Sequence, residues 1–197
     1  MGQSLTENRL FVVLLIASGL LNIGLAYKVH REQSLLRDLQ GSGNHAHVLG
    51  ATVKEIHAKG LDGKAATISF TKNEPPTILY IFRPTCGWCA KNLPNLQAMQ
   101  RSTVARHFRL IGISIDDHDL KQYVESEHFT FPVYSNVAPD ERARLAMGGT
   151  PQTLMIADGV VVRNWEGAYT PDLQKEIEST LGIKLPGMNA TPPSEHL

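Results

Sequence analysis

The sequence predicts a three-layer α/β domain that follows one N-terminal transmembrane helix. Short apolar runs, typical of buried strands, alternate along the chain with segments in which apolar residues recur at helical spacing. Residues 11–27 form a run without any charged residue, which is typical of a membrane span. The length of 197 residues fits one domain of ordinary size with an appendage.

The charge-free run is interpreted as a membrane anchor over residues 10–27. A helix of residues 11–27 would be about 26 Å long, at the short end for crossing a bilayer. Gly24-Leu25-Ala26 has the small-x-small form of a cleavage site, so the alternatives are a cleaved signal peptide and a buried soluble helix. Around the anchor we expect a flank over residues 1–9 and a polar stalk with a flexible linker over residues 28–47.

The predicted domain covers residues 48–182, and its first half contains two strands with a helix between them. Residues 77–82 and 109–115 are short apolar runs that predict buried strands. Residues 86–101 are predicted to be a helix, because their apolar residues recur at helical spacing.

Strands and helices continue to alternate in the second half. Acidic residues that suit the helix dipole are expected to open a helix over residues 117–127. Asp158-Gly159 predicts a tight turn between two strands, and Pro171 is well placed to begin the last helix. The remaining predictions are a strand near Val133, a helix over 140–147, strands over 152–157 and 160–163, an end of the last helix near Leu181, and a disordered tail over 183–197.

Composition excludes several classes of function. The chain has 19 Lys and Arg residues against 19 Asp and Glu, and this balance argues against a nucleic-acid binder that works by bulk positive charge. An apolar share of 42% argues against a highly charged disordered chain. Two cysteines are too few for a disulfide-stapled scaffold or a four-thiolate zinc site.

The two cysteines lie where the first buried strand passes into the first helix. Cys86 falls at the predicted helix N-terminus, where unsatisfied N–H groups and the helix dipole stabilise a thiolate and lower its pKa. Cys89 follows one turn later and can attack a mixed disulfide formed at Cys86. We therefore predict that this pair catalyses thiol–disulfide exchange without a dissociable cofactor or a metal. Gly87 leaves the first sulfur uncovered, and Trp88 is expected to shape the surface that a substrate meets.

Two plainer interpretations of the cysteine pair remain open. A zinc half-site would need two more ligands, and His45-x-His47 in the linker is the one histidine pair with metal spacing. A disulfide that only staples a loop would make the chain a non-catalytic, membrane-tethered module. A staple, however, needs no low-pKa thiol at a helix terminus.

The residues around the pair resemble the active site of the thioredoxin-like superfamily. Cys86-Gly-Trp-Cys89 is followed by Pro94, eight residues after the first cysteine, and Gly148-Gly-Thr-Pro-Gln152 resembles the loop of that fold with a cis proline. The resemblance implies a central mixed β-sheet flanked by helices. It also implies that Pro151 is the cis residue and that Thr150 offers its backbone to a substrate peptide.

Within this superfamily, the chain resembles the membrane-tethered TlpA/ResA-like branch of redoxin domains. The resemblance rests on the anchor and on residues 53–70, which contain the turn signal Leu61-Asp-Gly-Lys64. It implies a domain that faces the periplasm or the outer cell surface, whereas Lys28, Arg31 and Arg37 after the anchor would favour the cytoplasm by the positive-inside rule. The implied partners are disulfides of exported proteins, such as apocytochrome c, and a membrane electron donor that reduces the pair again.

Three positions depart from the family's pattern. Thr85 precedes the first cysteine where thioredoxins carry Trp, and Tyr80 stands where thioredoxin has a buried Asp that helps proton transfer. Asn92 stands where some TlpA/ResA-like proteins carry a functional Glu. The usual acid–base groups are therefore missing at these positions. Glu166 could approach from the last strand, although surface charge is its plainer role.

Two related folds offer alternative functions. A peroxiredoxin-like peroxidase resembles Pro-x-x-x-Thr-x-x-Cys at its site, and the matching positions before Cys86 hold Leu79 and Arg83 instead. A copper-binding assembly factor has three residues between its cysteines, where this chain has two. Both alternatives therefore fit the sequence less well than a thiol–disulfide oxidoreductase.

Overall fold

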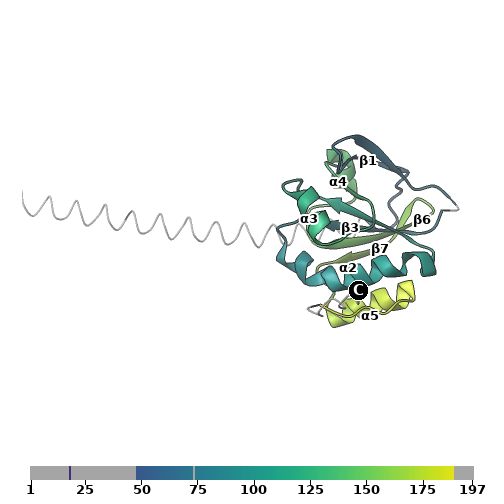
Figure 1. The fold of residues 1–197 in the computed structure, drawn as a ribbon. Helices are drawn as coiled ribbons and strands as arrows, with labels where there is room; N and C mark the ends of the chain where they lie inside the picture. The colour runs from purple at the N-terminus through teal and green to yellow at the C-terminus, as the bar shows by residue number, and fades with distance from the viewer. Residues whose placement is uncertain (1–17, 19–47, 73, 189–197) are drawn as a thin grey trace, which may run out of the picture. The chain divides into compact units, whose positions relative to one another are not determined.

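A mixed β-sheet forms the centre of the domain (Figure 1). The computed structural model describes Ser18 and residues 48–72 and 74–188. Among these residues, seven strands pair in the order β2-β1-β5-β4-β3-β6-β7. Their bounds are β1 Glu55–Gly60, β2 Ala65–Ser69, β3 Thr77–Phe82, β4 Arg109–Ser114, β5 Val133–Ser135, β6 Gln152–Ala157 and β7 Val160–Glu166.

Parallel strands occupy the middle of the sheet and antiparallel strands its edges. β3, β4 and β5 run parallel, which requires crossover connections between them. β6 joins β3 antiparallel, and β7 follows through the predicted turn at Asp158-Gly159, where both residues have positive φ (51° and 72°). At the other edge, the hairpin of β1 and β2 joins β5 through a short antiparallel pairing. The mixed sheet that the resemblance implied is therefore confirmed.

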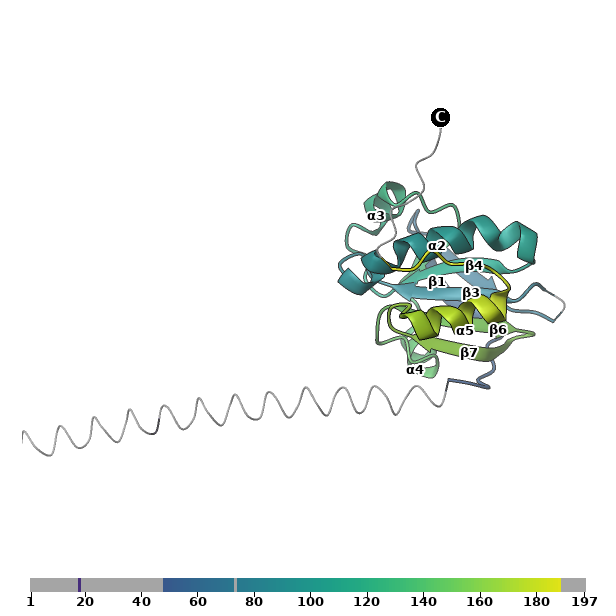
Figure 2. The same ribbon diagram turned by 90° about the horizontal axis from the view of Figure 1, so that it is seen from below.

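Helices cover both faces of the sheet and complete the three layers. Their bounds are α2 Gly87–Arg106, α3 Leu120–Ser126, α4 Pro139–Arg144 and α5 Pro171–Leu181. α2 and α5 lie side by side on one face (Figure 2). α4 lies beside β1. The buried Glu141 of α4 accepts a hydrogen bond from the backbone N–H of His57 in β1 at 2.8 Å.

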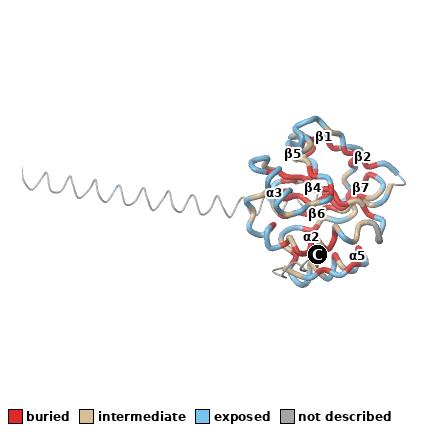
Figure 3. Tube along the Cα trace, viewed as in Figure 1, coloured by how far each residue is buried: buried red, intermediate tan, exposed pale blue. Residues whose placement is uncertain are grey.

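Alternate side chains of β3 enter two different cores. Every residue of this strand is buried, as expected for a strand that is covered on both faces. Ile78 and Tyr80 pack in the cluster that α2 and α5 share, and Leu79 and Ile81 pack in the cluster on the opposite face. Figure 3 shows buried residues along the central strands. Fully burying one such apolar side chain contributes about 1.5–3 kcal/mol.

Most predicted elements are confirmed with shifted ends, and the start of helix α3 is the clearest error. The helix begins at Leu120, and its first turn contains no acidic residue. Asp116 instead accepts a hydrogen bond from the His118 backbone N–H (3.1 Å), and Asp119 has a left-handed φ of 52°. The acidic residues therefore form a turn before the helix and do not open it.

The packed part of the chain continues beyond the predicted domain boundary. Ile183 and Leu185 are buried in the core that α2 and α5 share. The Gly187 N–H donates a hydrogen bond to the buried Asn95 side chain of α2 at 2.8 Å. The disorder predicted for the tail is therefore wrong for its first residues, whereas those from 189 onward lie outside the described residues.

The predicted anchor and stalk fall almost entirely outside the described residues. Of residues 10–27 the structure describes Ser18 alone, and it describes none of residues 28–47. In the described part of the chain, no helix combines the length and the apolar character that a membrane crossing requires. The membrane anchor stays a prediction.

The Glu178 carboxylate of α5 holds the C-terminal segment by hydrogen bonds, and we expect these bonds to weaken when acid protonates the carboxylate. Its carboxylate accepts hydrogen bonds from the Leu185 N–H (2.8 Å), the Gln174 side chain (3.1 Å) and Lys184 Nζ (3.2 Å). These bonds, the one from Leu185 first, lower the pKa of Glu178 to about 2. A lowered carboxyl pKa stabilises the fold at higher pH, and this stabilisation is lost as the pH falls toward about 2.

Glu178→Gln should therefore lower the free energy of unfolding at neutral pH. The difference from the wild type should shrink as the pH falls below about 4, which urea unfolding at a series of pH values would measure. Asp172→Asn is the matched control, because the Asp172 side chain is fully exposed on the same helix and its ion pair with Lys175 (3.9 Å) lies at the surface, where such pairs contribute little. A difference that does not change with pH would contradict a role for the ionised carboxylate.

Candidate active site

Cys86 lies where strand β3 gives way to helix α2, as predicted. It is the N-cap of α2, with an extended backbone (φ −82°, ψ 109°), and its sulfur accepts a hydrogen bond from the Cys89 N–H at 3.2 Å. The Cys86 N–H donates to the Arg83 carbonyl at 3.2 Å, which shapes the loop between strand and helix. The side chain is half-buried. Part of it therefore remains open to an approaching sulfur atom.

The surroundings of Cys86 favour its thiolate. Burial by itself would raise the pKa of Cys86, but hydrogen bonds with the side chains of Cys89 and Thr150 and with the backbone at the start of α2 outweigh it. The net result is a pKa below the ordinary value of a thiol. N–H groups at a helix N-terminus stabilise negative charge in this way.

Cys89 has the opposite character. It is 1% exposed on the inner side of α2, and burial raises its pKa to about 12. Both thiols are free in this structure. One sulfur is accessible and readily ionised, and the other is shielded. This arrangement lets Cys86 meet an outside disulfide while Cys89 reacts only within the protein.

The loop before β6 lies against Cys86. The Cys86 thiol donates a hydrogen bond to the Thr150 carbonyl oxygen at 3.5 Å. The Thr150–Pro151 peptide bond is cis, as the resemblance implied. Gly148 and Gly149 are exposed, Thr150 is half-buried and Pro151 is buried, so the loop is open to solvent up to Thr150 beside Cys86. Substrate binding by Thr150 and Pro151 remains a prediction.

Trp88 is a large apolar side chain that is exposed beside the cysteines. Its relative exposure is 55%, and Lys91 Nζ lies 4.4 Å from the centroid of its ring. Such a cation–π contact favours one position of the ring on the surface. The other large apolar side chains that are exposed in the described part of the chain are Leu49 and Leu61.

We expect Trp88→Ala to slow exchange with protein disulfides about tenfold, because an exposed aromatic anchor of this size commonly contributes more than 1 kcal/mol to binding. Exchange with oxidised glutathione, which is too small to need this surface, should change by less than about twofold. Stopped-flow rates with both substrates would measure the difference. Leu61→Ala is the control on the β1–β2 turn, and equal slowing with both substrates would contradict a role for Trp88 in recognition.

The positions that depart from the family's pattern lie in different surroundings. Tyr80 and Asn92 are buried (2% and 1% exposed), whereas Thr85 and Glu166 are exposed. Glu166 accepts a hydrogen bond from the Asn164 side chain at 2.7 Å. From the sequence, Tyr80 and Asn92 are expected only to lack the family's carboxylates, but both also place polar atoms in the core. The available signal was a polar residue one turn after Cys89, on the inner face of the helix.

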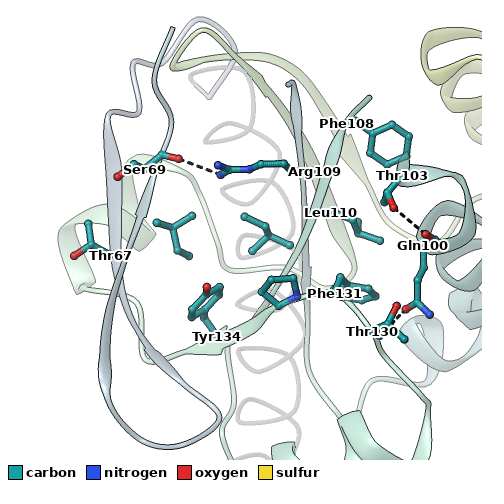
Figure 4. A pocket seen from close by; sticks show the side chains of 13 residues that line it. Thr67, Ser69, Gln100, Thr103, Phe108, Arg109, Leu110, Thr130, Phe131 and Tyr134 are labelled. Carbon is teal, nitrogen blue, oxygen red and sulfur yellow. Dashed lines mark hydrogen bonds between the residues drawn. The ribbon is translucent and has the colours of Figure 1, made fainter. Parts of the chain in front are cut away.

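A pocket of about 490 Å³ lies between the β1–β2 hairpin, β4 and the C-terminal half of α2 (Figure 4). At one end of it, the Arg109 guanidinium donates hydrogen bonds to Glu74 and to the Ser69 carbonyl, both at 3.0 Å. Arg109 opens β4, and Cys86 follows the far end of the parallel strand β3. The pocket therefore lies at the opposite end of the sheet from the cysteines, and neither cysteine lines it.

Among the described residues, no three His, Cys, Asp or Glu side chains cluster as a metal would require. His45 and His47 lie outside these residues. The expectation that the site works without a metal stays a prediction.

Comparison with known families decides the class of the protein. Residues 49–165 match the profile of the AhpC/TSA family. The chain belongs to the AhpC/TSA family. The prediction of a thioredoxin-like redoxin domain is thereby confirmed, and so is that of an oxidoreductase. No curated protein sequence matches the chain.

Solved structures share the fold of this AhpC/TSA domain. The thioredoxin domain of a thiol-disulfide oxidoreductase from Bacteroides vulgatus is 19% identical, with a TM-score of 0.54, over 68% of this chain and 97% of that one. StoA from Bacillus subtilis is 18% identical, with a TM-score of 0.51, over 64% and 98%. Peroxidoxin BcpB from Mycobacterium tuberculosis is 16% identical, with a TM-score of 0.53, over 68% and 94%. These likenesses confirm the thioredoxin-like fold.

Proposed function

We propose that the chain is a membrane-anchored thiol–disulfide oxidoreductase with Cys86 as the nucleophile and Cys89 as the resolving thiol. The contrast between the two sulfurs carries this proposal. Cys86 is accessible at a helix N-terminus, where its pKa is lowered, and Cys89 is buried, where its pKa is raised to about 12. Two equivalent thiols could also form a disulfide. Nothing would then decide which of them attacks the substrate first and which resolves the mixed disulfide.

The reaction consists of two exchanges at sulfur. The Cys86 thiolate attacks a substrate disulfide, forms a mixed disulfide and releases one substrate sulfur as a thiolate. Cys89 then attacks the Cys86 sulfur, so that the second substrate sulfur leaves and the Cys86–Cys89 disulfide forms. The two cysteines supply both electrons, and no dissociable cofactor takes part. The loop at Thr150 and Pro151 and the ring of Trp88 hold the substrate chain beside Cys86.

The membrane and the partners belong to the same proposal. The charge-free run at residues 10–27 and the TlpA/ResA-like resemblance support an N-terminal anchor, with the domain in the periplasm or on the outer cell surface. The substrates are then disulfides of exported proteins, and apocytochrome c is one candidate. A membrane electron donor reduces the Cys86–Cys89 disulfide after each cycle.

Trapping of partners tests this function. In cells that produce the full chain, Cys89→Ser should accumulate mixed disulfides between Cys86 and its protein substrates, since the resolving thiol is gone. Non-reducing gels and mass spectrometry would identify the partners and the side of the membrane on which they reside. Trapping by Cys86→Ser instead would reverse the two roles. Cytoplasmic partners alone would contradict the proposed location.

A peroxidase is the second candidate, because the AhpC/TSA family and the likeness to peroxidoxin BcpB favour it. The two positions where a peroxidase site would carry Pro and Thr hold Leu79 and Arg83 instead. Leu79 is buried in β3, and Arg83 begins the loop after that strand. Hydrogen peroxide consumption with dithiothreitol as reductant separates the two functions. A rate with peroxide that far exceeds the rate with protein disulfides would replace the first proposal by the second.

A further inference from the structure

Tyr80 places a hydroxyl group in the core beneath the active site. The side chain is 2% exposed on β3 and packs in the same buried cluster as Cys89. Its oxygen has no hydrogen-bond partner among the described residues. A buried hydroxyl without a partner is unfavourable, and phenylalanine would fill the same space without that cost. A hydroxyl in this place therefore calls for a role that packing does not supply.

Asn92 contributes a second unpaired group on the same side of α2. It is 1% exposed and lies one helical turn after Cys89. Its Oδ1 accepts hydrogen bonds from the Tyr169 N–H (3.1 Å) and from the Asn95 side chain (3.3 Å), which fixes the amide plane. Its Nδ2 donates to no described residue. One fixed donor therefore stays available within the core.

Cys89 and the Asn92 side chain both affect the pKa of the Tyr80 hydroxyl. Burial and then the charge of Cys89 raise the pKa of Tyr80 well above its ordinary value, and the Asn92 side chain opposes this shift. Tyr169 and Tyr123 are the other titratable groups that act on it. A phenol with a raised pKa stays protonated at neutral pH. It can therefore donate a hydrogen bond there, but it cannot serve as the base.

We propose that the Tyr80 hydroxyl donates a hydrogen bond to Cys89 Sγ when that sulfur becomes a thiolate, and that Asn92 Nδ2 donates to Tyr80 Oη and positions it. This role deepens the proposed function and rests on it. The role belongs to the resolving step, because Cys89 is the buried sulfur and must ionise within the core. Asn92 acts through Tyr80 and is a positioning residue.

The step balances without an added reactant. The Cys89 thiol gives its proton to solvent, its sulfur attacks Cys86 Sγ of the mixed disulfide, and the bond between Cys86 and the substrate sulfur breaks. The substrate sulfur leaves with the electron pair as a thiolate and takes up a proton from solvent. Tyr80 keeps its own proton throughout and only stabilises the charge on Cys89 before the new disulfide forms.

Release of glutathione from Cys86 tests the proposal in the full chain. The mixed disulfide of Cys86 with glutathione is formed at low pH, the pH is raised, and glutathione release is followed as a function of pH. Tyr80→Phe should slow release about tenfold at neutral pH and move the pH profile upward by about one unit, since a tenfold change in thiolate corresponds to one pH unit. Tyr80→3-fluorotyrosine, a stronger donor of similar shape, should accelerate release.

Tyr169→Phe is the matched control. Tyr169 is also a buried tyrosine of this cluster, but its hydroxyl already pairs with Thr153 at 2.8 Å. The control should leave the pH profile unchanged. Identical profiles for the wild type and Tyr80→Phe, or equal slowing by Tyr169→Phe, would overturn the role of Tyr80. A wild-type protein that never releases glutathione would instead overturn the proposed function, so the two failures are distinguishable.

Discussion

Cys86→Ser is expected to reduce the rate of thiol–disulfide exchange by roughly 10³-fold or more, as the loss of a nucleophile does in other enzymes. Serine fills the same N-cap position and accepts the same Cys89 N–H, so the fold should persist. Its hydroxyl cannot form the mixed disulfide. Reduction of insulin by the full chain, with dithiothreitol as the final reductant, would measure the loss.

The matched control for this variant is Cys89→Ser. It keeps the reactive thiol and should still perform the first exchange in a single turnover, although it cannot complete the cycle. Exchange that persists in Cys86→Ser, while Cys89→Ser is inert even in the first step, would contradict the assignment of the nucleophile.

Selective alkylation is the second large effect that we expect. The pKa of Cys86 is below the ordinary thiol value, and burial raises that of Cys89 to about 12, so their thiolate fractions at pH 7 differ by about 10³-fold or more. Iodoacetamide should therefore modify Cys86 more than about tenfold faster, even though a thiolate of lower pKa is intrinsically less nucleophilic. Mass spectrometry of digests at short reaction times would measure the ratio.

The alkylation rates of both cysteines should rise with pH, but they should level off at different pH values. The rate at Cys86 should rise with pH and level off below the ordinary thiol pKa, whereas the rate at Cys89 should keep rising toward about pH 12. The single variants Cys86→Ser and Cys89→Ser assign each profile to one sulfur. Similar rates and similar profiles at both sulfurs would contradict the asymmetric site.

Local patterns were sufficient to predict much of the fold and the centre of the site. The apolar run at residues 77–82 has no polar alternation, and β3 is buried on both faces as that pattern predicts. The cysteine pair lies between this strand and the next run of helical spacing. Cys86 therefore caps the N-terminus of α2, as that order predicts. The cis bond before Pro151 came from the resemblance and not from any local rule.

Features that depend on distant contacts could not be predicted in this way. Ile183 and Leu185 follow the last helix in a segment with few apolar residues, and only the shape of the core shows that both fit there. The turn before α3 uses Asp116 and Asp119, and their acidic character alone also suits a helix start. The unpaired hydroxyl of Tyr80 appears only when β3 and α2 are packed together.

A redox titration of the full chain tests the central claim most directly. The protein is equilibrated with thiol–disulfide buffers of known potential, and the free thiols are trapped and counted by mass. A thiol–disulfide oxidoreductase should show one reversible two-electron couple between Cys86 and Cys89, with a potential between about −300 and −120 mV. A bond that stays closed well below about −300 mV, or a pair that never forms a disulfide, would contradict the proposed catalytic role.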